Sequence, residues 1–170
     1  MIKITAVSFI VFGFAVSGFY FSSVYEKKTE ILNSVVSMVT AVKTQLRYAH
    51  LPVSSILVFL QENRSANSLR FISECSERMG SGEPFADLWQ KSIENEKELC
   101  KLIPESVPHL IRFGRSLGTT DLEGQISCCE YYERIFAEEL NEKTEQCKKY
   151  SKLFPTLGIM LGISVAIMII

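Results

Sequence analysis

The sequence predicts an all-α protein, in which a small helical domain is flanked by two transmembrane helices. Two long uncharged runs lie at the ends of the 170-residue chain. Between them, apolar residues recur at spacings of three and four, the period of an amphipathic helix, and no alternating strand pattern is seen. We therefore divide the chain into residues 1–24, 25–152 and 153–170, with about six helices in the middle segment.

Residues 4–24 contain no charged side chain. As a helix they would extend about 31 Å, the thickness of the hydrocarbon core of a bilayer. A secretory signal peptide is the alternative, because only Lys3 precedes the run. However, the run exceeds the roughly 7 to 15 apolar residues of such peptides, and Phe19, Tyr20 and Phe21 stand where a cleavage site would need small residues. We favour a transmembrane helix.

Residues 153–170 form a second uncharged run, which as a helix would extend about 27 Å, just enough to cross a bilayer. Basic residues near membrane segments favour the cytoplasmic side. Only Lys3 lies on an outer flank, whereas five lysines lie on the inner flanks: Lys27, Lys28, Lys148, Lys149 and Lys152. We expect a double-pass cell-membrane protein with a cytoplasmic middle domain and both termini outside.

The middle segment has the length of one domain with its own core. It holds 17 basic and 19 acidic residues, a formal charge of −2, so the basic footprint of a nucleic-acid-binding protein is missing. The five cysteines of the chain are an odd number in a segment expected to face a reducing compartment. We expect neither a nucleic-acid partner nor a disulfide framework.

The first helix of the middle segment is predicted over residues 29–48. Neither Pro nor Gly separates it from the run 4–24, so the two could form one long helix. The sequence His50-Leu51-Pro52 ends it, because Pro lacks a backbone donor and disfavours helical geometry at the preceding residue. A wide apolar stripe follows one face: Ile31, Leu32, Val35, Val36, Met38, Val39, Val42 and Leu46.

Three short helices are expected next, over residues 52–63, 66–79 and 84–93. Pro52 suits the first position of a helix, and the glycines of Gly80-Ser81-Gly82 suit a helix end. The 84–93 helix carries the single Trp of the chain, Trp89, and is expected to anchor the core. We interpret the charged residues 94–101 as a loop or a frayed helical turn.

The last two helices are predicted over residues 106–117 and 121–151, separated by Gly118. Thr119, Thr120 and Asp121 offer side-chain oxygens that can cap the second of these helices. Its packing stripe ends at Leu140. Residues 141–152 are polar all round, and we interpret them as a solvated stalk.

The sequence argues against an enzyme, and we predict no catalytic residue, cofactor, metal site or small-molecule substrate. His50 lies at a helix break and His109 beside a Pro, so neither has an evident acid or base partner. The sequence contains no C-x-x-C pair of the kind that binds zinc. Cys128 and Cys129 point to different helix faces, and a thiol enzyme that uses them would lose function when both become Ser. We expect that double substitution to be tolerated.

Residues 117–125 read LGTTDLEGQ, which resembles the Leu-Gly-x-Ser/Thr-Asp-x-x-x-Gln stretch of the stage III sporulation protein AB family of endospore-forming bacteria. Thr120 stands where Ser is frequent in that family, which keeps the capping hydroxyl. Further agreement comes from Leu51-Pro52-Val53, from residues 83–89 (EPFADLW) and from the two apolar ends. The order and spacing of these features carry the resemblance along the whole chain.

This resemblance implies a non-enzymatic part in the channel complex that joins mother cell and forespore. The family is similar to the cytoplasmic domains of platform protein F of type II secretion and type IV pilus systems. The protein would then lie in the mother-cell membrane around the forespore. Its expected partners are membrane lipid, other membrane components of the complex, and the cytosolic secretion-type ATPase of the channel.

We hypothesise that the turn between the last two helices forms part of the partner-facing surface, with Arg112, Arg115, Thr120, Asp121 and Gln125 as its residues. A helix cap with two arginines nearby exceeds what ending a helix requires. In the alternative interpretation, Thr120 or Asp121 caps the helix, Gln125 ties the turn together, and the arginines are simply solvated.

The alternative function is that of a membrane-tethered adaptor or regulator that self-associates. Leu32, Val39 and Leu46 are in heptad register within the 31–46 stripe. Amphipathic helices more often face the core of their own domain. A compact monomer in sedimentation would favour the platform domain, and an elongated dimer would favour the adaptor.

Overall fold

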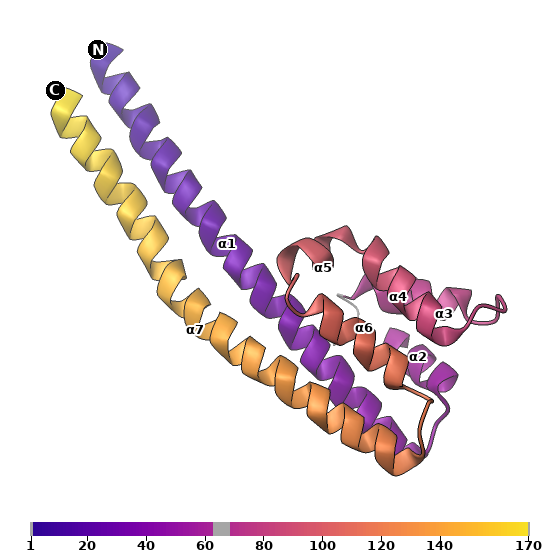
Figure 1. Cartoon of the computed structure of the whole chain (residues 1–170). Coiled ribbons are helices and arrows are strands. Elements are labelled where there is room, and N and C mark those ends of the chain that lie inside the picture. Colours follow the sequence, from indigo (N-terminus) through magenta and orange to yellow (C-terminus); the bar gives the residue numbers. More distant parts are fainter. Residues whose placement is uncertain (1, 63–68, 170) are drawn as a thin grey trace. The chain divides into compact units, whose positions relative to one another are not determined.

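A computed structural model describes residues 2–62 and 69–169 of the chain, and its regular elements there are helical throughout. This confirms the all-α class. In chain order the elements are α1 (Ile2–Thr44), the π-helix η1 (Gln45–Ala49), α2 (Val53–Glu62), α3 (Arg70–Arg78), α4 (Phe85–Asn95), α5 (Lys97–Leu102), α6 (Val107–Ser116) and α7 (Leu122–Ile169) (Figure 1).

The chain divides into two compact units. One, which we call the helical unit, comprises Glu30–Leu140 and lies inside the predicted middle segment. The other, the terminal unit, comprises Met1–Thr29 and Asn141–Ile170 and is built from stretches of α1 and α7. Across residues 2–62 and 69–169, no helix combines the length and the apolarity needed to span a membrane.

Within the helical unit, α1 and α7 run antiparallel (Figure 1). The ion pairs show this, since Lys43 pairs with Glu133 and the later Arg47 pairs with the earlier Glu130. The predicted α1 stripe faces the core of this unit. Leu32, Val39 and Leu46 are at most 3% exposed, so the heptad positions invoked for self-association are already covered by the chain's own core. This removes the surface on which the adaptor interpretation depended.

The centre of the core is Trp89 on α4. Its ring lies 5.0 Å from that of Phe71 and 6.2 Å from that of Phe113, between centroids, both in edge-on geometry. The indole N–H donates a hydrogen bond of 2.9 Å to the carbonyl oxygen of Leu110 on α6. Gly114 on the same helix passes so close that an added Cβ would lie 2.1 Å from Trp89 Cδ1. The prediction that Trp89 anchors the core is therefore confirmed, and the absent side chain at position 114 is what lets α4 and α6 approach.

The break after the first helix was predicted correctly, but its geometry was not. α1 widens into η1 and the chain then turns through His50, which is left-handed at φ 50°. This conformation is uncommon for a residue with a Cβ, although His adopts it more readily than most. The Pro52 carbonyl then accepts the N–H groups of Ser55 and Ile56 and starts α2. A π-helical segment such as η1 accommodates an extra residue in a helix, and the spacing of apolar residues alone does not reveal that insertion.

Two other predictions need correction. Residues 94–101 were expected to be a loop or a frayed turn, but α5 forms there because Leu99 is fully buried and anchors the short helix. The last helix was expected to end at residue 151, yet α7 continues through Pro155 to Ile169. A Pro removes one backbone hydrogen bond, and the helix tolerates that loss. The predicted helix boundaries at residues 63 and 66 fall outside the described residues, and α3 is described from Arg70.

A half-buried carboxylate links α1 to α7. Glu133 is bonded by Lys43 Nζ and lies 2.6 Å from Thr40 Oγ1. The Thr40 hydroxyl is also 2.9 Å from the Val36 carbonyl oxygen, and its single proton serves one of these acceptors at a time. Burial disfavours the charged carboxylate, but the bonds from Lys43 and Thr40 outweigh it and hold the pKa of Glu133 below its ordinary value. The ionised form is therefore the one that stabilises the fold.

We expect Glu133→Gln to lower the free energy of unfolding at pH 7 by about 1 kcal/mol. Because the pKa of Glu133 is lower in the folded state, its contribution is complete above the unfolded value near 4.5 and is lost as the pH falls through the folded value. Urea unfolding between pH 3 and 7 should thus show wild type and variant converging in acid. The control is Glu130→Gln, whose exposed pair with Arg47 should contribute less than about 0.5 kcal/mol. A constant difference at every pH would contradict this assignment.

Candidate partner-binding surface

The turn between α6 and α7 has a backbone hydrogen bond at the end of α6 and a side-chain cap at the start of α7. At the end of α6, the Leu117 N–H donates a hydrogen bond of 3.2 Å to the Gly114 carbonyl oxygen. Gly118 then reverses the chain in a left-handed conformation with φ 75°. α7 begins after Asp121, whose Oδ1 accepts the Gly124 N–H at 3.0 Å. A carboxylate at this N-cap position satisfies one of the free N–H groups of the helix and suits its positive end. The predicted capping role of Asp121 is confirmed.

Gln125 closes the turn with both ends of its amide. Its Oε1 accepts the Gly118 N–H at 3.0 Å, and its Nε2 donates to the Thr120 carbonyl oxygen at 3.0 Å. Gly124 fits closely beside it, since an added Cβ would lie 2.8 Å from Asp121 Oδ1 and 2.9 Å from Thr120 Oγ1. The LGTTDLEGQ stretch therefore encodes a specific turn geometry.

Replacing Gln125 should measure what this closure contributes. We expect Gln125→Ala to lower the free energy of unfolding by about 1 kcal/mol, because two hydrogen bonds to the backbone are lost. Gln125→Glu keeps an acceptor for the Gly118 N–H but cannot donate to Thr120, so its loss should be smaller. Thermal melting of the two variants provides the test. If the Glu variant were as unstable as the Ala variant, the bond to Gly118 would not be the stabilising one.

The structure brings together only part of the predicted surface. Thr120, Asp121 and Gln125 share the turn, whereas the two arginines project from α6. Arg115 Nη2 donates a bond of 2.6 Å to Gln90 Oε1 on α4, and both arginines are exposed. The three turn residues thus have a structural role already, and the arginines are the residues left available to a partner.

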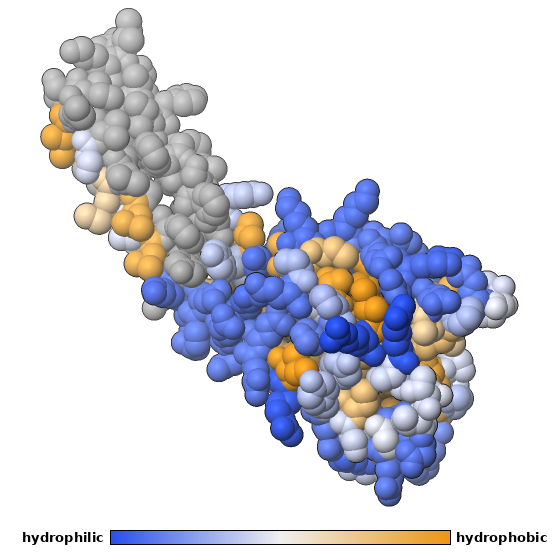
Figure 2. All heavy atoms as spheres, viewed as in Figure 1, coloured by the Kyte–Doolittle hydropathy of each residue, from blue (hydrophilic) through white to orange (hydrophobic). Residues whose placement is uncertain are grey.

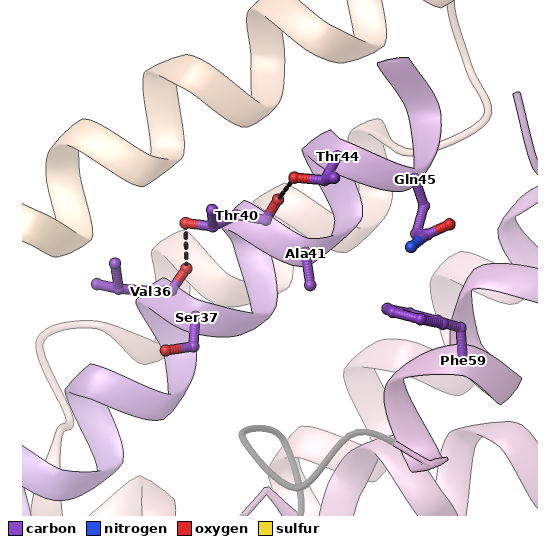
Figure 3. A pocket seen from close by; sticks show the side chains of 7 residues that line it. All are labelled: Val36, Ser37, Thr40, Ala41, Thr44, Gln45 and Phe59. Carbon is purple, nitrogen blue, oxygen red and sulfur yellow. Dashed lines mark hydrogen bonds between the residues drawn. The ribbon is translucent and has the colours of Figure 1, made fainter. Parts of the chain in front are cut away.

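Two grooves in the helical unit were not foreseen. One, of about 360 Å³, lies where the α1–α2 corner meets the α6–α7 turn, and is lined by Leu46, His50, Leu51, Pro52, Val53, Gly118, Leu122 and Gln125. The other, of about 380 Å³, lies between α1 and α2, and is lined by Val36, Ser37, Thr40, Ala41, Thr44, Gln45 and Phe59 (Figure 3). Each joins segments that are apart in the sequence, so no linear motif could have shown it.

Thiol chemistry has little support from the geometry. Burial raises the pKa of Cys75 to about 11 and that of Cys129 to about 12, which leaves both as poorly nucleophilic thiols at neutral pH. Cys128 is half-buried on another face of α7, with its Sγ 2.8 Å from Ser116 Oγ. The two neighbouring cysteines therefore point to different faces, as predicted. Within the described part of the chain, no three His, Cys, Asp or Glu residues are grouped so that they could hold a metal ion.

Comparison with known proteins gives one family. A family model described as "Stage III sporulation protein AB" matches residues 3–170, nearly the whole chain. No curated protein matches, and no solved structure does. The match agrees with the resemblance carried by the LGTTDLEGQ turn.

Proposed function

Because the chain belongs to the stage III sporulation protein AB family and so acts in sporulation, we propose that it is a platform component of a channel complex between mother cell and forespore. In this proposal it performs no catalysis and docks the cytosolic secretion-type ATPase of the complex through the helical unit. The observation that carries the proposal is the family match over residues 3–170. The helical unit supports it, because its apolar residues form one core and its charged α6 surface stays open to a partner.

The experiment is co-purification of the ATPase with the full-length protein extracted in mild detergent. The comparison is a variant in which residues 25–152 are deleted. We expect the ATPase to bind the full-length protein and not the deletion variant. Equal binding by both, or no binding by a full-length protein of native helicity, would overturn the docking role.

The proposal includes anchorage in the mother-cell membrane through residues 4–24 and 153–170. Both runs lack charged residues, and the five lysines on their inner flanks favour a cytoplasmic helical unit with both termini outside. We expect the protein to stay in the membrane pellet after carbonate extraction, and to be released when both runs are deleted. Release of the intact protein by carbonate would contradict the anchorage.

A further inference from the structure

The exposed face of α6 carries positive charge only. No acidic residue occurs between Val107 and Ser116, and Arg112 and Arg115 are exposed one helical turn apart. Several basic side chains elsewhere in the helical unit are paired with carboxylates, as in Arg47 with Glu130 and Arg78 with Glu83. In the described residues, by contrast, no carboxylate lies within ion-pair distance of Arg112, and Arg115 bonds only the neutral amide of Gln90.

An exposed aromatic side chain lies on the neighbouring helix. Tyr131 on α7 is 60% exposed, and its ring stands edge-on to that of Tyr132 with 5.2 Å between centroids. Tyr132 in turn packs against Phe113 of α6 at 5.6 Å. Burial raises the pKa of Tyr132, and the charge of Arg112, which directly precedes Phe113 in α6, opposes that rise. We call Arg112, Arg115 and Tyr131 the α6 patch.

We propose that the α6 patch binds an acidic segment of the cytosolic partner, with Arg112 and Arg115 contacting carboxylates and Tyr131 covered by apolar atoms. This inference deepens the proposed function and rests on it for the identity of the partner. Arg and Tyr are the residue types that most often dominate binding energy at interfaces. Figure 2 shows strongly hydrophilic side chains gathered over α6 beside apolar ones, the mixed surface that such an interface uses.

The hydrogen bond that Arg115 now makes is weaker than the one it would make to a carboxylate of an acidic partner. When Arg115 turns from Gln90 to a carboxylate, one bond to a neutral amide is replaced by charge-assisted bonds, which are shorter and stronger. A guanidinium can also bind a carboxylate with two parallel N–H bonds, a geometry that Lys cannot offer. Thr120, Asp121 and Gln125 hold the turn that follows α6, and in this proposal they do not contact the partner.

The experiment measures the affinity of the full-length protein for the ATPase at low and high salt. We expect the double variant Arg112→Glu/Arg115→Glu to bind about 30-fold more weakly at 50 mM salt, and the difference to shrink several-fold at 500 mM salt. The control is Lys97→Glu/Lys101→Glu, which makes the same charge change at exposed positions of α5 and should alter affinity less than about threefold. Tyr131→Ala should weaken binding about tenfold at both salt concentrations.

A second arm does not depend on the ATPase. Retention on a polyglutamate column should fall much more in the α6 variant than in the α5 control, although both have the same net charge. If the ATPase does not bind the wild-type protein but the α6 variant is retained less than the α5 control, the docking role fails. The inference that the α6 patch binds acidic segments then stands. Equal losses in the two double variants, in either arm, would overturn the inference while leaving a docking role intact. Unchanged far-ultraviolet circular dichroism ensures that each variant is folded.

Discussion

Gly114→Ala is expected to destabilise the helical unit by about 3 kcal/mol or more. The new Cβ would lie 2.1 Å from Trp89 Cδ1, 2.2 Å from Nε1 and 2.4 Å from Cγ, all atoms of a rigid ring. The ring cannot retreat, since Phe71 and Phe113 pack against it and its N–H is bonded to Leu110. The gain of about 1 kcal/mol from replacing a helical Gly by Ala is too small to compensate.

Gly124→Ala is the matched control for this prediction. It also places a Cβ inside a helix, but the nearest atoms belong to the exposed side chains of Asp121 and Thr120, which can move. We expect a change within about 1 kcal/mol. Thermal melting of both full-length variants is the measurement. Similar melting temperatures for Gly114→Ala and wild type would show that α4 and α6 can separate without loss of core packing.

Trp89→Ala is expected to cost about 3 to 5 kcal/mol, because the largest buried side chain is removed and the cavity cannot fully close. Combined with Gly114→Ala, this substitution tests whether the Trp89 ring is what excludes a side chain at position 114. Once the ring is absent, the three atoms nearest to the Cβ at position 114 are gone, and Ala should then stabilise α6 relative to Gly. The effect of Gly114→Ala should therefore change sign between the two backgrounds.

A double-mutant cycle tests this coupling, and each corner is measured by urea unfolding. We expect an interaction free energy of about 3 kcal/mol or more in favour of the double variant. Additive effects of the two substitutions would mean that Gly114 is required for its backbone conformation. In that case the contact with Trp89 would not explain the absence of a side chain there.

The helices that the sequence predicts well are those with a clear apolar period and a strong terminator. Phe85, Leu88, Trp89 and Ile93 mark α4, and Gly118 marks the end of α6, which lies at Ser116, one residue before the predicted one. The α5 helix was missed because it has only six residues, and one buried residue, Leu99, holds it in place. Periodicity needs several turns before it can be recognised, so such a helix depends on tertiary packing that the sequence does not display.

For the candidate surface, local chemistry was predictable and surface geometry was not. The capping role of Asp121 follows from its place before an apolar stripe. By contrast, Arg112 and Tyr131 belong to different helices, which lie together because of tertiary contacts such as the packing of Phe113 on Tyr132. The groove between the α1–α2 corner and the α6–α7 turn has the same origin, since Gly118 and Pro52 meet only when two distant turns fold against each other.

Trp89 also gives this protein an intrinsic optical probe. It is the single Trp of the chain, it is 1% exposed, and its indole N–H is bonded to a backbone carbonyl. Its fluorescence should therefore be blue-shifted in the native protein and move to longer wavelengths when the helical unit opens. Because the terminal unit contains no Trp, this emission reports on the helical unit selectively, even in a detergent micelle or a lipid vesicle.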